Sequence, residues 1–323
     1  ISVVLAYLMT TIFPIVSSIL LVMLLGYGLS KKLLTDSLFW QGISKLSYWV
    51  LFPVLIVHTL AHATIDTGLL LPLFTIFTVA LILILIYCVL VARLLGQDGA
   101  STAALTQGGI RHNGFIGLAV LVDIFGLPGQ EMGALMIAVL MPSTNVLSVL
   151  SVSLLVRKNQ PQEQFLSTLI IKELLRNPML VAVAIGLLLN VLSISIPTIL
   201  DQSMDLVSRA ALPILLLGVG ASLKMSSLRG RWPTLAAALS AKLLVFPALL
   251  LGGAWWFNLS PLVTVCLVVF GALPTAVSAY PFIQQMGGNA KLMADIITLQ
   301  TLASLIGLTF WTSLAIHLTG LVL

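Results

Sequence analysis

The chain has 323 residues, of which 59% are hydrophobic and only 8% are charged. A soluble domain needs roughly a quarter of its residues charged to keep its surface in water, so the composition excludes a soluble protein. It indicates an integral membrane protein with little chain outside the bilayer. The net charge of +5 would suggest nucleic-acid binding in a soluble chain. Here it is expected to reflect membrane orientation, and no nucleic-acid partner is predicted.

A helix needs about 20 mostly apolar residues to cross about 30 Å of hydrocarbon. By this rule the sequence contains ten predicted spans, and the predicted fold class is an all-α integral membrane protein. The first five spans cover residues 4–28, 41–60, 69–95, 100–122 and 131–156. An inner linker at residues 157–172 follows, and the second five cover residues 173–195, 203–223, 232–256, 261–286 and 291–319. The first span has no small-residue cleavage site and is predicted to be a retained helix rather than a signal peptide.

Basic residues gather at alternate joints between these spans. Joints after spans 1, 3, 5, 7 and 9 hold Lys31, Lys32, Lys45, Arg93, Arg157, Lys158, Lys172, Arg176, Lys224, Arg229, Arg231 and Lys291. Joints after spans 2, 4, 6 and 8 hold no lysine or arginine. Because cytoplasmic loops carry the excess of basic residues, the protein is predicted to lie in the cytoplasmic (inner) membrane with both termini outside.

The order of the spans also indicates an internal repeat. Ten spans split into two halves of five, residues 1–156 and 173–323, and an odd number per half inverts the second half relative to the first. Pro53 in span 2 aligns with Pro213 in span 7 at an offset of 160 residues. We therefore predict two inverted five-helix repeats.

Span 4 contains the polar run Arg111-His112-Asn113-Gly114 where hydrocarbon is expected. Unsatisfied polar groups are costly in the membrane and glycine weakens a helix, so this span is predicted to break near its centre. Span 9 is interrupted at a comparable depth by the segment from Pro274 to Pro281. Two interrupted spans in corresponding halves point to the binding site of a secondary transporter.

The crossing of the two broken spans is the predicted substrate site. A helix that starts after a break presents free N–H groups and the positive end of its dipole, which suit a carboxylate. Asn113 adds an amide, and Gly114 lets a ligand approach the backbone. Arg111 is either a counter-charge for an anionic substrate or an anchor that pairs with a carbonyl or reaches the inner interface. His112 either couples transport to protons or is a packing residue.

Polar residues in spans 5 and 9 are further candidates for this cavity. Thr144 and Ser148 share one helix face, a pattern that often serves only to hold helices together, whereas Asn145 is the stronger cavity candidate. Ser278 and Tyr280 lie between the two prolines of span 9. The predicted substrate-binding set is Arg111, His112, Asn113, Gly114, Thr144, Asn145, Pro274, Thr275, Ser278 and Tyr280.

Several absences narrow the predicted function. No span core contains aspartate or glutamate, which disfavours a sodium/proton antiporter. The sequence has no Walker loop, Gly-x-Ser-x-Gly or His-Glu-x-x-His motif, so no enzyme is predicted. No cofactor and no metal site is predicted, because His58, His62 and His317 lie at span ends or outer joints without ligand spacing for a metal.

Other polar or small residues are assigned to packing or to the interface. Lys242 lies near the inner end of span 8 and is expected to extend its ammonium group to that face. Gln300 in span 10 is expected to pack between helices. Gly218 and Gly220 in span 7 are expected to allow close helix contact.

The run from Gly109 to Leu118, with His112-Asn113-Gly114 at its centre, resembles the span 4 motif of the auxin efflux carrier family, particularly its bacterial members. Further resemblance lies in Asn177-Pro178, in the segment from Pro213 to Ser222, and in the run Leu273-Pro274-Thr275-Ala276-Val277. The similarity covers essentially the whole chain, and the motifs of spans 4 and 9 are its specific part.

The resemblance implies a ten-helix, inverted-repeat fold similar to bile-acid and sodium/proton transporters, with broken helices 4 and 9 crossed. It implies a scaffold of spans 1, 2, 6 and 7, a transport domain of spans 3–5 and 8–10, elevator-type alternating access and often a homodimer. In plant members, a span 4 asparagine and a span 5 polar residue contact the auxin carboxylate, and these positions match Asn113 and Asn145. Plant members have proline where this chain has His112, and a long inner loop that this chain lacks. Bacterial relatives are associated with malonate and other small carboxylates.

The leading hypothesis is a secondary transporter of small organic carboxylate anions, malonate-like or auxin-like, with the lipid bilayer as its surroundings. One alternative is a membrane sensor that binds a ligand without moving it. Another is a sodium-coupled, bile-acid-like symporter that binds sodium through backbone carbonyls and Asn, Ser or Thr. Sodium dependence of uptake distinguishes the last alternative.

Overall fold

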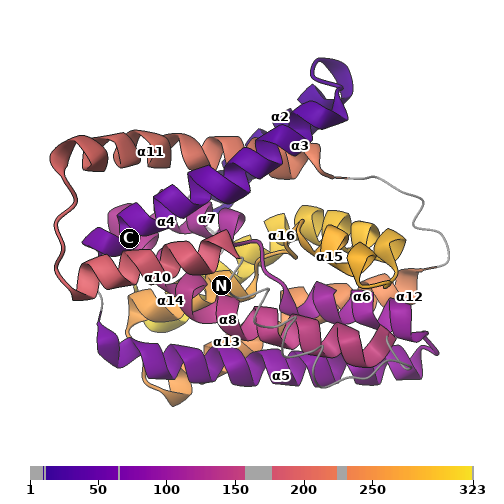
Figure 1. Cartoon of the computed structure of the whole chain (residues 1–323). Coiled ribbons are helices and arrows are strands. Elements are labelled where there is room, and N and C mark those ends of the chain that lie inside the picture. The colour runs from indigo at the N-terminus through magenta and orange to yellow at the C-terminus, as the bar shows by residue number, and fades with distance from the viewer. Residues whose placement is uncertain (1–9, 11, 65, 157–176, 224–230, 322–323) are drawn as a thin grey trace.

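The computed structural model describes residues 10, 12–64, 66–156, 177–223 and 231–321, and every regular element in them is helical (Figure 1). Within these residues, seven helices are long and apolar enough to cross a membrane: Phe13–Lys32, Ser37–His62, Thr67–Leu94, Leu127–Val156, Thr198–Ala221, Trp232–Trp256 and Ala290–Thr319. They correspond to predicted spans 1, 2, 3, 5, 7, 8 and 10. The helices support an integral membrane protein, while the count of ten crossings stays a prediction.

The long helices contain nine of the labelled elements: α2 (Phe13–Lys32), α3 (Ser37–Leu46), α4 (Phe52–His62), α5 (Leu70–Leu94), α8 (Leu127–Val156), α11 (Thr198–Ala221), α12 (Trp232–Ser240), α13 (Phe246–Trp256) and α16 (Ala290–Thr319). Three predicted spans correspond to shorter helices: α6 (Gly99–Ile110) with α7 (Gly114–Phe125), α10 (Pro178–Val191), and α14 (Pro261–Gly271) with α15 (Ala279–Gln285). The predicted start of span 6, at residues 173–176, lies outside the described residues. The predicted interruptions of spans 4 and 9 are confirmed.

Two long helices continue through a proline by means of a π-helical turn. The turn Ser47–Leu51 comes just before Pro53, and the turn Ala241–Val245 comes just before Pro247. Proline lacks an N–H donor, and its ring clashes with the carbonyl group four residues earlier. A wider turn at this point relieves the clash, so α3 and α4 form one span, as do α12 and α13.

Some helices extend beyond the ends that hydropathy predicted. α2 continues past residue 28 to Lys32, α8 begins at Leu127 rather than 131, and α11 begins at Thr198 rather than 203. The added turns contain polar residues such as Asp201, which lower the local hydropathy without breaking the helix. A span predicted from apolar residues therefore ends before the helix does.

The helices form two packed groups that meet at α7 and α8. In one group, α4 packs on α10 and α11, and α11 packs on α2; in the other, α5 packs on α6, α8 and α13, and α16 packs on α6, α12 and α14. Figure 1 shows α2 and α11 crossing on one side of the molecule while α5 runs along the opposite side. A Cβ atom on Gly220 would overlap the carbonyl group of Met23, and one on Gly26 would overlap that of Leu217. The close helix contact predicted for Gly220 is confirmed.

The broken helices lie in the protein interior. Every residue of α6 from Ser101 to Ile110 is buried, and so is every residue of α14 from Val263 to Gly271. By contrast, α5 exposes large apolar side chains such as Leu71, which suits contact with lipid. Non-helical backbone at membrane depth is tolerated only where protein or a cavity surrounds it, and the position of the two breaks meets this condition.

Candidate substrate site at the two helix breaks

The two breaks are in direct contact. The backbone N–H of Asn113, between α6 and α7, donates a hydrogen bond to the carbonyl oxygen of Pro274, between α14 and α15, at 2.9 Å. The hydroxyl group of Thr275 lies 2.7 Å from the carbonyl oxygen of Gly108, which it faces as a donor. Backbone groups that lose their partner within one helix at the break thus form hydrogen bonds with residues at the other break.

Gln300 of α16 completes this network from a third helix. Its Oε1 accepts from the N–H of Thr275 at 3.1 Å and lies 2.6 Å from the Thr275 hydroxyl group. Its Nε2 donates to the carbonyl oxygens of Gly108 at 3.0 Å and Ala238 at 2.8 Å. Sequence reasoning assigned Gln300 to packing; the structure shows that this fully buried amide holds the two breaks together. Thr275, a predicted substrate residue, belongs to the same structural network.

Asn113 begins α7 as its N-cap residue. Its side-chain oxygen accepts a hydrogen bond from the N–H of Ile116 at 3.4 Å, and its side chain is only 3% exposed. The first N–H groups of a helix have no partner within the helix and carry partial positive charge. The buried start of α7 therefore presents an amide and a positive helix end at the crossing.

Arg111 connects the break to α8 and to the start of α15. Its Nε donates to the Ser148 hydroxyl group at 3.5 Å, and its NH1 donates to the Ser278 hydroxyl group at 3.3 Å. The guanidinium group also lies over the ring of Phe282, with 4.5 Å to the centroid. These contacts hold the guanidinium group at the break.

Lys242 is the second cation at the crossing, and here the structure corrects the sequence interpretation. The side chain does not extend to the inner face; it is fully buried, with Nζ 3.5 Å from the carbonyl oxygen of Gly109. The ammonium group also lies 4.7 Å from the ring centroid of Phe246. The last carbonyl groups of a helix carry partial negative charge, so the interrupted end of α6 attracts this cation.

His112 also contacts the Phe246 ring, with the two ring centroids 4.8 Å apart. Both of its ring nitrogens are buried, and neither has a hydrogen-bond partner among the described residues. Buried polar groups are almost always hydrogen-bonded in folded proteins. The imidazole therefore has hydrogen-bonding capacity that no described residue uses, and its role, proton coupling or packing, stays a prediction.

The polar face of α8 points toward the same break. Ser151 accepts a hydrogen bond from Gln107 of α6 at 3.3 Å, and Ser148 accepts from Arg111. The hydroxyl group of Thr144 and the amide nitrogen of Asn145 are buried and have no partner among the described residues. The polar residues of α8 therefore serve partly as contacts between helices and partly as polar groups without a partner among the described residues.

The remaining predicted site residues differ in their settings. Ser278 is exposed and bonded to Arg111, while Tyr280 is half-buried at the edge of the apolar core. A Cβ atom on Gly114 would lie 3.4 Å from the side chain of Ile137, so a side chain at this position would point toward α8. The expected opening for a ligand at Gly114 is thus partly filled by Ile137.

A surface depression of about 390 Å³ lies between α5 and α8, away from the cations. Its lining is apolar: Leu70, Leu71, Phe74, Ala138, Val139 and Pro142. Such a surface suits a lipid chain rather than an anion.

Comparison with known families identifies the chain as a member of a transporter family. A family model described as membrane transport protein matches residues 10–312, which include both helix breaks. The chain belongs to the auxin efflux carrier family. A search of curated proteins finds no match. The protein is therefore a multi-pass membrane transporter, and the family resemblance read from the motifs around Asn113 and Pro274 is confirmed.

Proposed function

We propose that this carrier moves a small organic carboxylate across the cytoplasmic membrane, with the substrate carboxylate bound where the two helix breaks meet. The observation that carries the proposal is the buried imidazole of His112 at the break, whose two nitrogens have no partner among the described residues. Thr144 and Asn145, about one turn from Ser148 along α8, add two more buried polar atoms without such partners. Two buried or half-buried cations, Arg111 and Lys242, are close to the same break. An anion that accepts hydrogen bonds satisfies the donors among these groups and compensates the positive charge.

The start of α7 is the proposed anchor for the substrate. Asn113 caps the helix with its oxygen, which leaves its amide N–H₂ group for a ligand, and the helix dipole favours a negative charge there. The segments 108–117 and 272–281 contain no aspartate or glutamate. A site with this charge selects an anion over a cation. The malonate-like and auxin-like acids suggested by the family resemblance both present such a carboxylate.

Alternating access is proposed to arise from movement of one helix group against the other. The packing of α2, α4, α10 and α11 with one another supports the proposed scaffold, and the packing of α5, α6, α8 and α12 to α16 supports the proposed transport domain. The ten crossings, the two inverted repeats, the outward termini, the homodimer and the elevator motion remain parts of this proposal.

The test is flux of radiolabelled malonate and indole-3-acetate in proteoliposomes, with Asn113→Asp as the decisive variant. Asp caps a helix as well as Asn does, so the variant should fold. Two carboxylates within about 4 Å repel by about 4 kcal/mol in partly buried surroundings, so flux should fall by at least about a hundredfold.

Asn289→Asp is the matched control, because Asn289 caps α16 in the same way, accepting from the N–H of Leu292 at 3.0 Å. Its flux should stay near that of the wild type. Wild-type flux in Asn113→Asp would show that the carboxylate binds elsewhere. Running the assay with and without a sodium gradient separates a sodium-coupled symporter from a carrier that needs no sodium, and saturable binding without flux of either acid would indicate a sensor.

A further inference from the structure

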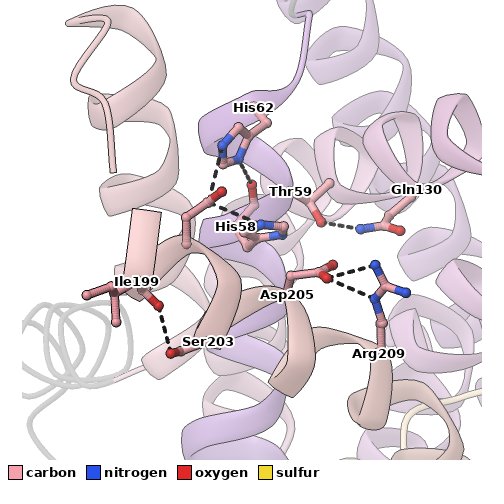
Figure 2. Close-up of polar contacts among 9 residues, drawn as sticks. His58, Thr59, His62, Gln130, Ile199, Ser203, Asp205 and Arg209 are labelled. Carbon is pink, nitrogen blue, oxygen red and sulfur yellow. Dashed lines mark hydrogen bonds and ion pairs between the residues drawn. The ribbon is translucent and has the colours of Figure 1, made fainter. Parts of the chain in front are cut away.

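A second polar cluster lies far from the helix breaks, where the end of α4 meets the start of α11 (Figure 2). His58 and His62 are four residues apart on α4 and therefore share one face of the helix. Asp201, in the first turn of α11, places its Oδ1 atom 3.3 Å from Nε2 of each histidine. All three potential ligand atoms lie within 4.8 Å of one another.

The hydrogen bond made by His62 fixes which of its nitrogens can bind a cation. Its Nδ1 lies 2.9 Å from the carbonyl oxygen of His58. A carbonyl oxygen can only accept, so Nδ1 carries the hydrogen and Nε2 of the neutral ring carries a lone pair. This lone pair faces Asp201 Oδ1, which is buried and makes no hydrogen bond with the described residues. In the neutral form of the ring, two acceptors face each other, and a cation bound between them satisfies both.

Two of the three separations between ligand atoms match those of a tetrahedral metal site, and the third pair, the two histidine nitrogens, lies within 4.8 Å. With Zn–N distances of about 2.0–2.1 Å and Zn–O distances of about 2.0–2.2 Å, two ligands of tetrahedral zinc lie about 3.3–3.5 Å apart. Both Nε2 to Oδ1 separations are 3.3 Å. Imidazole suits zinc and its neighbours, whereas calcium and magnesium prefer sites built from oxygen. We propose that His58, His62 and Asp201 bind a zinc ion, with water as the fourth ligand, that ties α4 to α11.

The surroundings of the cluster hold these ligands in position. His62 is the last residue of α4, where the free carbonyl groups of the helix end favour a cation. Asn190 of α10 donates from Nδ2 to the carbonyl oxygens of Ala61 at 3.3 Å and Ala63 at 2.7 Å, so the end of α4 is fixed. Backbone hydrogen bonds of this kind, together with the bond from His62, orient a metal ligand.

Neighbouring charges do not compete for the proposed metal. Asp205, one turn after Asp201, is paired with Arg209 at 2.8 and 2.9 Å, as Figure 2 shows. Thr59 accepts a hydrogen bond from Gln130 of α8 at 2.7 Å, which fixes the rotation of α4 next to the site. The side chain of His62 is 52% exposed and that of Asp201 is 34% exposed, so an ion can enter from solvent. In the predicted topology this is the outer face.

The test is zinc binding to purified, tag-free protein in detergent, measured by competition with a chromophoric chelator. We expect about one zinc ion per chain, and affinity at least about tenfold lower in each of His58→Gln and Asp201→Asn, since even indirect support of a metal ligand is worth about 10–100-fold. Cobalt(II) in place of zinc should give the visible absorption of tetrahedral cobalt in the wild type but not in His58→Gln or Asp201→Asn. Asp205→Asn and His317→Gln serve as controls: Asp205 is already paired with Arg209, and His317 is exposed on α16. Both should bind zinc as the wild type does.

A melting curve of each variant in chelator establishes that it is folded, and zinc should raise the melting temperature of the wild type and controls only. Failure of the wild type to bind stoichiometric zinc would overturn the proposal. So would unchanged zinc affinity in a His58→Gln/Asp201→Asn double variant. A cluster that gains stability on acidification and binds no zinc would instead be an ion pair of protonated histidines with Asp201.

Discussion

Gln300 provides the sharpest test of how the two breaks are held together, through the substitution Gln300→Leu. Leucine keeps most of the volume and removes both polar atoms of a side chain that is fully buried. Four hydrogen-bond contacts are lost: two from Thr275 to Oε1, and two from Nε2 to the carbonyl oxygens of Gly108 and Ala238.

These losses are unequal, and the structure indicates which one costs most. The Gly108 carbonyl oxygen keeps the Thr275 hydroxyl group as a donor, and the Ala238 carbonyl oxygen keeps the N–H of Ala241. The N–H of Thr275 loses the partner it has in Gln300, at a cost of about 1–3 kcal/mol for a buried donor. Hydrogen bonds between membrane helices average about 0.6 kcal/mol, so the two bonds from Nε2 add about 1 kcal/mol. The Thr275 hydroxyl group has one hydrogen, which it gives to the Gly108 carbonyl oxygen, so its contact with Oε1 adds nothing further. The expected total is about 2–4 kcal/mol.

The assay is reversible unfolding of the purified protein by a denaturing detergent, followed by tryptophan fluorescence. Gln284→Leu is the control, because Gln284 is exposed on α15 and should change the free energy of unfolding by less than about 0.5 kcal/mol. A loss below about 1 kcal/mol in Gln300→Leu would refute the reasoning. It would mean that the breaks keep their contact through Asn113 and Pro274 without the amide.

Two further substitutions test other parts of the fold. Gly220→Ala should lower the free energy of unfolding by about 1–3 kcal/mol, because the new methyl group overlaps the Met23 carbonyl group. Gly218→Ala is the control, because its methyl group meets only Ile43 at 3.5 Å and should be neutral or slightly stabilising. Equal effects of the two substitutions in detergent unfolding would contradict this reasoning. Asp98→Ala removes the N-cap of α6 and should cost about 1 kcal/mol at pH 7. The Ser101 backbone N–H, at 2.7 Å, lowers the pKa of Asp98 in the folded state, so its contribution is full above the unfolded pKa and is lost as pH falls through the folded pKa. The charge-dependent part of the stability difference between wild type and variant should therefore begin to fall near about pH 4 and disappear only below the lowered folded pKa. A difference that stays constant through this range in unfolding measurements would exclude the charge as its source.

The sequence predicted the helix breaks because their signal is local. Arg111, His112 and Asn113 interrupt an apolar run, and Pro274 does the same in the second half. Several polar residues at membrane depth are tolerated mainly where an interrupted helix is surrounded by protein. The break can therefore be predicted without knowledge of the neighbouring helices. The family motif coincides with these interruptions, since the residues that break the helices also form the crossing.

The roles of Lys242 and Gln300 could not be predicted in the same way. Their depth along a span can be read from the sequence, but the direction of a side chain depends on the rotation of its helix against its neighbours. Lys242 lies near enough to the inner end to reach it, yet the carbonyl group of Gly109 offers a closer partner. That carbonyl group becomes available only because α6 ends beside α12 and its π-helical turn, an arrangement that depends on the tertiary structure.

The proposed zinc site could also be predicted only in part from the sequence, because its ligands come from two separate helices. The four-residue spacing of His58 and His62 places both on one helix face, although the sequence analysis predicted no metal site from these histidines. Two histidines alone leave the site incomplete, and Asp201 lies in a polar turn that hydropathy excluded from span 7. Only the packing of α4 on α11 brings the third ligand into place.

The charges at the crossing also bear on the proposal that this carrier moves an anion. A broken helix pair has two kinds of ends: the start of α7 is positive, and the end of α6 is negative. In a cation exchanger, a buried carboxylate provides the ion site. Here Lys242 occupies the negative end of α6, so that end is already compensated, while the positive end at Asn113 has no acidic residue within its own segment. The positive start of α7 at Asn113 therefore supports the proposed carboxylate substrate over sodium or a proton.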